Sequence, residues 1–266
     1  MPVLVTRPQR EAQAWVREFC AAGLAAQALP LIEIRLAPDA PSLQRARQHL
    51  ADGRYAALMC VSANAVAGLF EGNPALSAVL SETSAIKTRA WAPGPGTAAA
   101  LQQCGVAPTR IDAPARDAAQ FDSETLWQVV SPQVQPGDRV LIVRGTQDQP
   151  DSPATGSGRD WLVQRITEAG GQVELVVAYQ RTCPTWDERQ RQQATRAAVD
   201  GSVWLFSSSE AVHNLQTLLP AQSWQAARAV ATHPRIAAAA RAAGFGVVCV
   251  SRPALADVRA SIESIQ

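Results

Sequence analysis

The sequence predicts an α/β protein built from two similar domains, each with a parallel β-sheet covered by helices. Short apolar runs with β-strand character alternate with amphipathic helical runs along all 266 residues, which is typical of parallel strands joined by helical crossovers. A hydrophobic fraction of 47% and a charged fraction of 18% are globular values. The order of the segments also repeats after about half of the chain, so we expect two related domains with a cleft between them.

The first half alternates regularly between the two kinds of segment. Strands are expected at 2–6, 25–38, 55–62 and 89–94, and helices at 10–24, 42–53, 65–72 and 96–106. Ala12, Trp15, Val16, Phe19 and Cys20 fall on one face of the first helix, and Gly23 and Gly53 are natural helix stops.

The second half follows the same alternation. Strands are expected at 138–145, 172–184, 202–209, 227–232 and from 247, and helices at 158–171, 187–201 and 234–246. Three pairs of segments match between the halves: VLVTRP with VLIVRG, CVSANAV with LFSSSEAV, and APGPGTAAALQQCGV with ATHPRIAAAARAAGF. The runs 25–38 and 172–184 are longer than their neighbours. If they connect the domains, the chain crosses over and returns, and the pattern alone leaves that open beside two consecutive domains.

Composition excludes several classes of function. A net charge of +1 gives no electrostatic case for nucleic acid or an anionic membrane. The five cysteines contain no C-x-x-C pair and the three histidines are not clustered, so no metal site is expected. The start of the chain lacks a signal-peptide core, and no apolar run has the length of a membrane span. We therefore expect a soluble, cytoplasmic protein.

Two hydroxyl-rich turns follow strands at matching places, Ser62-Ala63-Asn64 and Ser207 to Ser209. The carboxyl ends of parallel strands are where α/β sheets bind ligands. Such turns can cap the next helix and leave backbone N–H groups facing a ligand, although capping alone is a complete alternative explanation for each turn.

The segment from Pro93 to Leu101 has the composition of a glycine-rich anion loop that opens a helix, with Gly94, Gly96 and Thr97. It lacks the G-K-[ST] of a Walker A loop and the third glycine of a dinucleotide fingerprint. Its counterpart, Ala231 to Pro234, carries Thr232 and His233 in place of the glycines. For His233, a polar residue at a helix start is favoured over a catalytic base.

Arginines and one tyrosine complete the candidates. Arg7, Arg144 and Arg159 follow strands or open a helix and can bind carboxylates through two hydrogen bonds, with exposure on the surface as the competing interpretation. Tyr179 lies on the long run 172–184, where it either packs at an interface or faces the cleft. No G-x-S-x-G elbow supports a hydrolase triad.

These residues resemble uroporphyrinogen-III synthases along essentially the whole chain. The resemblance is carried by VLVTRP, VSANAV, PGPGTAAAL, VLIVRG with GRDWL, VVAYQRT, FSSSEAV and the closing SRPALADVRASI. It implies two α/β domains joined by a two-stranded β connector, with the chain crossing over and returning. The domains would comprise residues 1–36 with 183–266 and residues 38–174, with connectors near 29–38 and 173–184.

The resemblance also implies the reaction. A cofactor-free, monomeric lyase closes the linear tetrapyrrole hydroxymethylbilane, inverting the last pyrrole ring with loss of water. Transient contact with neighbouring enzymes of the pathway stays open. Tyr179 would help to protonate the leaving hydroxyl. The candidate substrate-binding residues are Thr6, Arg7, Ser62, Ala63, Asn64, Gly94, Gly96, Thr97, Arg144, Gly145, Arg159, Ser207, Ser208, Ser209, Thr232 and His233.

Two other classes of function stay open at this point. A two-domain binding or sensor protein that closes on an anionic ligand without chemistry would share the same anion-binding turns. A nucleotide-dependent enzyme is disfavoured because the lysine of a phosphate loop is missing.

Overall fold

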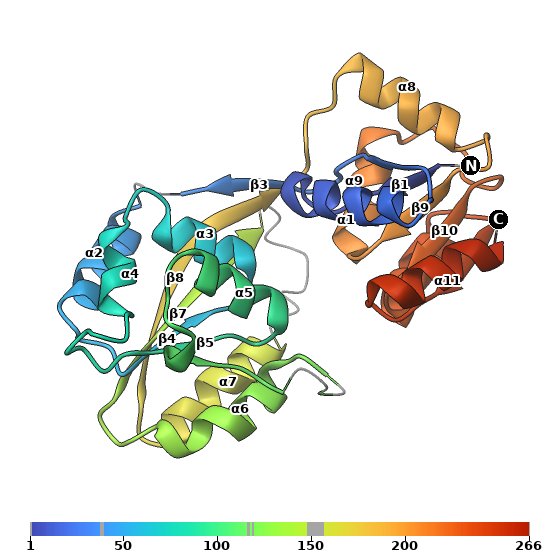
Figure 1. The fold of residues 1–266 in the computed structure, drawn as a ribbon. Helices are drawn as coiled ribbons and strands as arrows, with labels where there is room; N and C mark the ends of the chain where they lie inside the picture. The colour runs from blue at the N-terminus through green and yellow to red at the C-terminus, as the bar shows by residue number, and fades with distance from the viewer. Residues whose placement is uncertain (1, 38–39, 116–117, 119, 148–156, 266) are drawn as a thin grey trace. The chain divides into compact units, whose positions relative to one another are not determined.

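The structure is a computed structural model that describes residues 2–37, 40–115, 118, 120–147 and 157–265. The chain divides into two compact units (Figure 1). Unit 1 comprises Met1–Glu33 and Thr182–Gln266, and unit 2 comprises Ile34–Arg181. The chain thus leaves unit 1 early, forms unit 2 without interruption, and then returns.

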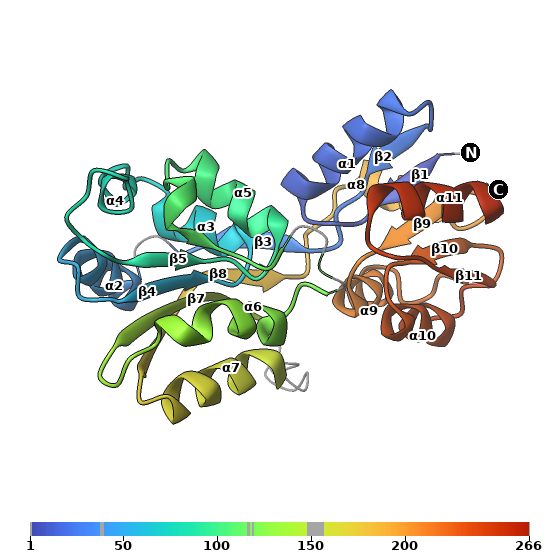
Figure 2. The same ribbon diagram turned by 60° about the horizontal axis from the view of Figure 1, so that its bottom comes forward.

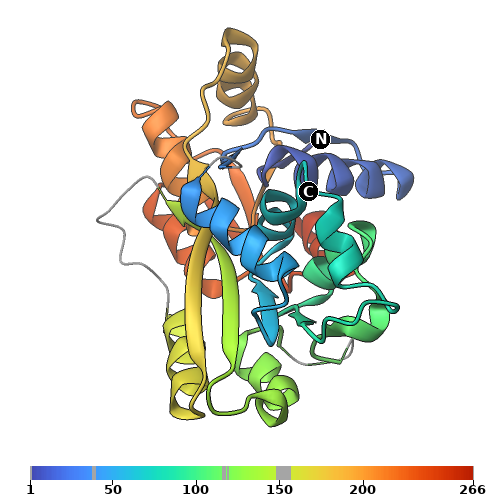
Figure 3. The same cartoon turned by 90° about the vertical axis from the view of Figure 1, so that its left-hand side faces the viewer.

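Unit 2 contains a six-stranded sheet in the order β3-β8-β7-β4-β5-β6. From β8 to β6 all neighbours pair in parallel. The strands are β3 (Glu33–Leu36), β4 (Ala57–Cys60), β5 (Arg89–Trp91), β6 (Ile111–Asp112), β7 (Arg139–Gln147) and β8 (Gln172–Thr182). The two long strands β7 and β8 run side by side (Figure 3, yellow-green and gold).

Helices cover both faces of this sheet (Figure 2). On one face α2 (Pro41–Ala51), α3 (Ala63–Phe70), α4 (Ala75–Val79) and α5 (Pro95–Gln103) enclose one apolar cluster. On the other face α6 (Ser123–Val130) and α7 (Ser157–Glu168) enclose a second cluster. The strand β4 is buried on both faces, which is why its sequence is a continuous apolar run instead of an alternating one.

Unit 1 contains a five-stranded sheet in the order β11-β10-β9-β1-β2, and every pair is parallel. Its strands are β1 (Val3–Val5), β2 (Ala26–Ala28), β9 (Val203–Phe206), β10 (Arg228–Ala231) and β11 (Val247–Val250). Its helices are α1 (Gln9–Ala21), α8 (Glu188–Ala197), α9 (Ser209–Leu218), α10 (Pro234–Ala242) and α11 (Leu255–Ile265).

The two faces of the unit 1 sheet are packed differently. The helices α1 and α11 cover an apolar cluster on one face, and α9 and α10 lie on the other (Figure 2). An aromatic cluster of Trp204, Phe206, Trp224 and Phe245 fills part of the core, with ring centroids 5.3 to 6.2 Å apart. Such offset and edge-on pairs add to the area that the rings bury.

The two sheets have the same order when β9 is matched with β4, β10 with β5, and β1 with β7. These are the three segment pairs that the sequence repeat matched, so the predicted fold class of two similar parallel-sheet α/β domains is confirmed. The order along the chain differs, because the strand β1 comes first in unit 1 whereas its counterpart β7 comes fifth in unit 2.

Two details differ from the expectation. The run 25–38 is not one strand but β2 and β3, separated at Pro30, which has no N–H to donate to a ladder. Cys20 does not belong to the buried face of α1 but is exposed, because it lies about 100° around the helix from the buried Phe19. The short elements α4, α6 and β6 were not expected at all.

The helix α3 lies unusually close to β8. A Cβ atom on Gly68 would lie 2.5 Å from the carbonyl oxygen of Ala178. The end of α3 is held by Arg47 of α2, whose Nε donates to the carbonyl of Leu69 at 2.9 Å and whose Nη2 donates to that of Gly68 at 2.8 Å. A cation at a helix C-terminus satisfies carbonyls that lack intrahelical partners, so the last turn of α3 is fixed by close packing and by these hydrogen bonds.

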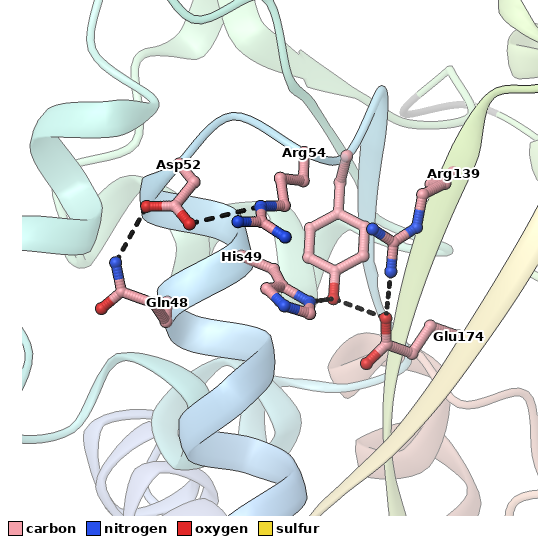
Figure 4. A network of polar contacts seen from close by, with 7 residues as sticks. Gln48, His49, Asp52, Arg54, Arg139 and Glu174 are labelled. Atoms are coloured by element: carbon pink, nitrogen blue, oxygen red, sulfur yellow. Dashed lines mark hydrogen bonds and ion pairs between the residues drawn. The ribbon is translucent and has the colours of Figure 1, made fainter.

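A polar network joins α2 to the amino ends of the strands (Figure 4). The Tyr55 hydroxyl donates to Glu174 at 2.7 Å, and Arg139 donates to the same carboxylate at 2.9 Å. His49 Nδ1 lies 3.5 Å from the Tyr55 hydroxyl. Burial of the phenol, together with its hydrogen bond to Glu174, raises the pKa of Tyr55 well above its ordinary value of 10.

Replacing Gly68 with alanine tests the close packing of α3. An unhindered Gly→Ala change inside a helix gains up to about 1 kcal/mol, but the new Cβ of Gly68→Ala meets a backbone oxygen, so we expect a net loss of about 1–3 kcal/mol. Gly96→Ala is the matched control, because no atom lies within 4 Å of its added Cβ, and it should not destabilise. Urea denaturation measures both; equal stability of the two variants would contradict the packing.

The Tyr55 network predicts a loss of stability in alkali. Because the folded-state pKa of Tyr55 lies above that of the unfolded chain, its contribution is complete below pH 10 and is lost as the pH rises above that value. Tyr55→Phe should therefore cost about 1 kcal/mol at neutral pH, with the gap to the wild type narrowing above pH 10. Denaturation between pH 8 and 11 measures this gap, and a constant gap would refute it. Burial also raises the pKa of Cys60, but this thiol is present in both proteins, so its effect on stability cancels in the difference.

Candidate functional site

Each sheet has one place where the strand order reverses direction, between β4 and β7 in unit 2 and between β1 and β9 in unit 1. Open α/β sheets bind ligands at the carboxyl ends of the strands beside such a switch point. The predicted site residues Ser62 and Gly145 lie at the switch point of unit 2, and Thr6 and Ser207 lie at that of unit 1. The sheet order thus brings them together within each unit.

In unit 2 the hydroxyl of Ser62 caps α3 by accepting the N–H of Ala65 at 3.2 Å. The same Oγ lies 3.1 Å from the phenol oxygen of Tyr179 on β8. Tyr179 is only 5% exposed, and its ring lies over Gly145, where an added Cβ would come within 2.3 Å of the ring carbon Cζ. The structure therefore joins three predicted site residues into one cluster.

Of the two predicted arginines of unit 2, Arg144 and Arg159, the structure describes the side chain of Arg144 only. Arg144 on β7 is half-buried, and its Nε is buried without a hydrogen-bond partner among the described residues. A buried guanidinium N–H without a partner is costly, so this group is suited to an anionic ligand. Arg159 lies in the first turn of α7, and its side chain is outside the described part of the chain.

The glycine-rich loop forms the start of α5, as expected. Gly94 is its N-cap, in an extended conformation with φ of −164°, and Thr97 is buried in the first turn. An added Cβ would meet Phe121 at 3.3 Å at Gly94, whereas Gly96 faces open space. In α5, Pro95 has no N–H and the N–H of Thr97 donates to the carbonyl of Gly94 at 3.2 Å, so Gly96 supplies the N–H for an anion there. The first N–H groups of α3 have no acceptor within the helix, so both helix starts can bind anions. The predicted site residues Ala63 and Asn64 lie in the first turn of α3.

In unit 1, Thr6 and Arg7 directly follow β1 at the switch point. Thr6 Oγ1 donates to the carbonyl of Leu205 at 2.6 Å, tying β1 to β9, so this hydroxyl already has a structural role. The Arg7 guanidinium lies 4.4 Å from the ring centre of Trp15, and its Nη1 lies 3.4 Å from Glu11. Burial lowers the pKa of Arg7, although Glu11 opposes this. The Nε of Arg7 is buried without a hydrogen-bond partner among the described residues.

The second hydroxyl turn carries three serines with two different roles. Ser208 caps α9, accepting the N–H of Glu210 at 3.2 Å. The hydroxyls of Ser207 and Ser209 are buried, and neither has a hydrogen-bond partner within the described residues. Buried polar groups are normally paired, and those without a partner point to a ligand or water. The start of α9 therefore has spare hydrogen-bonding capacity that plain capping does not explain.

The loop at the start of α10, the counterpart of the glycine-rich loop of α5, has fewer groups that can bind an anion. His233 is the N-cap, and its Nδ1 accepts the N–H of Arg235 at 3.1 Å. Pro234 has no N–H, and Ile236 donates to the carbonyl of His233. This helix start therefore has no backbone N–H left in its first turn for an anion. The N–H of Thr232 donates to Phe206, which leaves the side chains of Thr232 and His233 as the candidate contacts.

Two residues that matter for the site were not predicted from sequence. Gly68 lets α3 approach β8, and Arg47 holds the end of that helix. A glycine inside the helical pattern AVAGLF is a recognisable signal for close packing. Arg47 carried no comparable signal, because it lies on the helix 42–53 among other polar residues.

Two cavities lie away from these residues. One of about 330 Å³ is lined by residues at the amino ends of β4, β5 and β7. Its arginines are paired with acids, Arg54 with Asp52 and Arg139 with Glu174. Lys87 and Asp138 add one charge of each sign, so the cavity does not favour an anion. A second, of about 400 Å³, is a groove between α1 and α11. Within the described residues we find no cluster of three or more potential metal ligands and no helix able to span a membrane.

Comparison with known proteins connects this arrangement to one family. A family model described as uroporphyrinogen-III synthase HemD matches residues 13–257. The chain has the same fold as the uroporphyrinogen-III synthetase of Helicobacter pylori, with a TM-score of 0.62, 15% identity and 100% of both chains covered. It also resembles a mutant uroporphyrinogen III synthase of Thermus thermophilus, with a TM-score of 0.53, 17% identity, and 100% of this chain and 98% of that one covered. No curated protein sequence matches the chain.

Proposed function

Because the chain belongs to the uroporphyrinogen-III synthase family, we propose that it closes hydroxymethylbilane to uroporphyrinogen III, with inversion of the last pyrrole ring and loss of water. The match of the family model to residues 13–257 is the observation that carries this proposal. The geometry supports it, because each unit has a switch point with groups that bind anions, and the substrate carries eight carboxylates.

The carboxylates are bound by helix starts and arginines. The first turns of α3, α5 and α9 offer backbone N–H groups to anions, and Arg7 and Arg144 each keep a buried Nε without a partner among the described residues. The unpaired hydroxyls of Ser207 and Ser209 add two donors. Four further residues, at or near the carboxyl ends of the strands in the two units, contribute less to substrate binding: Thr6, Arg159, Thr232 and His233.

Tyr179 acts as the general acid. Its phenol gives a proton to the leaving hydroxyl of the substrate while the carbon–oxygen bond breaks, and the pyrrole nitrogen supplies the electron pair for the new double bond. Water departs, and the proton that the substrate later releases on ring closure restores the phenol. Tyr179 is suited to this because its ring is fixed over Gly145 and its oxygen is held by Ser62.

We propose further that no cofactor takes part. The electron-rich pyrrole itself drives loss of the hydroxyl, so the protein has to supply a proton donor and the geometry of closure, and positioning contributes most of the rate. This accounts for the absence of a second acid or base beside Tyr179 in the contacts described.

The isomer of the product tests the proposal. Purified protein supplied with hydroxymethylbilane, generated in situ, should give the type III porphyrin after oxidation, whereas spontaneous closure gives type I. Tyr179→Phe should give the same isomer with kcat lowered by roughly 10- to 100-fold, at the low end for a general acid because the hydroxyl leaves readily. Type I product alone would refute the activity, and an unchanged kcat would remove Tyr179 from the mechanism. Circular dichroism confirms that the variant is folded.

The buried serines of unit 1 give a second test. Ser207→Ala and Ser209→Ala should each raise KM several-fold without loss of stability, since the removed hydroxyl has no protein partner among the described residues. Ser202→Ala is the matched control. Its hydroxyl is also buried and unpaired by the same measure, but it precedes β9 at the opposite edge of the sheet, so KM should not change. Equal KM values for all three variants would contradict a binding role.

A further inference from the structure

The phenol of Tyr179 is held by a bulge in the sheet and by the cap of a helix. In the pairing of β7 with β8, Arg144 is opposite Val177 but Gly145 is opposite Tyr179, so Ala178 is left out of the ladder. The carbonyl of Ala178 instead accepts the N–H of Ala37 at 3.1 Å. A bulge of this kind re-aims the side chain beside it, and here that side chain is Tyr179.

Gly145 is a glycine for reasons of space. Its backbone is not among the glycines with positive φ, so any residue fits its conformation. An added Cβ would lie 2.3, 2.4 and 2.8 Å from the ring carbons Cζ, Cε2 and Cε1 of Tyr179, far inside contact distance. The ring therefore occupies the volume of the missing side chain and cannot remain there if Gly145 is enlarged.

The hydroxyl of Ser62 makes two polar contacts. A serine hydroxyl has one proton and two acceptor positions, and the N–H of Ala65 uses one acceptor position at 3.2 Å. The second contact of this hydroxyl is to the phenol oxygen of Tyr179, 3.1 Å away, and either hydroxyl can be its donor. With Ser62 as the donor, the N–H of Ala65, the hydroxyl of Ser62 and the oxygen of Tyr179 form one chain in which each hydrogen bond polarises the next. This chain begins at the positive end of α3.

We propose that Ser62 is a positioning residue that donates its proton to the Tyr179 oxygen, and that Gly145 is the socket that allows the ring to reach it. The phenol proton is then free to face the substrate, and the phenolate that remains after proton transfer keeps a donor linked to the start of α3. This inference rests on the proposed role of Tyr179 as acid, and it moves Ser62 from the group that binds carboxylates to the group that controls the proton.

Variants of Ser62 separate this role from capping. Ser62→Ala removes both the cap and the donor. Ser62→Asp keeps a good cap but offers only acceptors, so the phenol proton turns towards it. Ser62→Thr keeps both functions. We expect kcat to fall about 5- to 10-fold in Ser62→Ala and Ser62→Asp, and Ser62→Thr to restore it. KM should stay within twofold of the wild type in Ser62→Ala, whereas the added negative charge in Ser62→Asp should also raise KM for an anionic substrate. A rise in KM with kcat unchanged would show that Ser62 binds substrate directly, and would overturn the inference.

A measurement without substrate keeps the two proposals apart. The chain has two tyrosines, so labelling at Cζ with carbon-13 gives two signals, with Tyr55 as the internal reference. The Tyr179 signal should shift in Ser62→Ala and in Gly145→Ala while that of Tyr55 stays. An unmoved signal in both variants would overturn the positioning role. A shifted signal together with full activity of Tyr179→Phe would leave the positioning intact and remove the catalytic role instead.

A double-mutant cycle tests the socket through stability alone. Gly145→Ala should be clearly destabilising in the wild type, because the ring must leave its place. In a Tyr179→Ala background the same change should cost little, since the clashing atoms are gone. Equal costs in the two backgrounds would show that Gly145 is required for another reason and would overturn the socket.

Discussion

The site in unit 2 depends on two missing side chains. At Gly68 the absence of a Cβ lets α3 reach the carbonyl of Ala178, and at Gly145 it lets the Tyr179 ring approach the backbone of β7. With either position enlarged, the start of α3 and the phenol move apart, and the 3.1 Å contact between Ser62 and Tyr179 is lost. Arg47 secures the arrangement from the far end of α3. Close packing of backbone, more than any ion pair, sets the geometry of the candidate acid.

The same topology carries different groups in the two units. At the switch point of unit 2 the hydroxyl turn holds a phenol, whereas the matching turn of unit 1 keeps two buried hydroxyls without a partner in the described structure, beside Arg7. We interpret the turn of unit 2 as the part of the site that takes part in the reaction, and the turn of unit 1 as a part that binds the substrate. A repeated sheet provides both because the residues after its strands vary without changing the core.

Much of the fold was predictable because alternation, glycine stops and the repeat are local signals. The three matched segment pairs identified the strands that occupy equivalent places in the two sheets. The sequence also identified the turns at Ser62 and Ser208 as helix caps. It did not reveal that Ser62 and Tyr179, 117 residues apart, touch, nor that His233 occupies the N–H of Arg235. Those facts follow from a bulge and from one side-chain rotation, which no periodicity encodes. Helix α6 was overlooked, although Asp122 is its N-cap and its buried residues Leu126 and Val130 have helical spacing.

The strand order of unit 1 has a consequence for the order in which the protein is made. The strand β1 emerges first, but its neighbour β9 begins only at Val203, roughly 175 residues after β2 ends at Ala28. At about 5–20 residues per second, the ribosome needs roughly 9 to 35 s to supply it. During that time unit 2 is synthesised in full, while the apolar segment Val3–Val5 lacks its partner on one side. The nascent chain therefore carries an unpaired strand edge, a natural target for a chaperone.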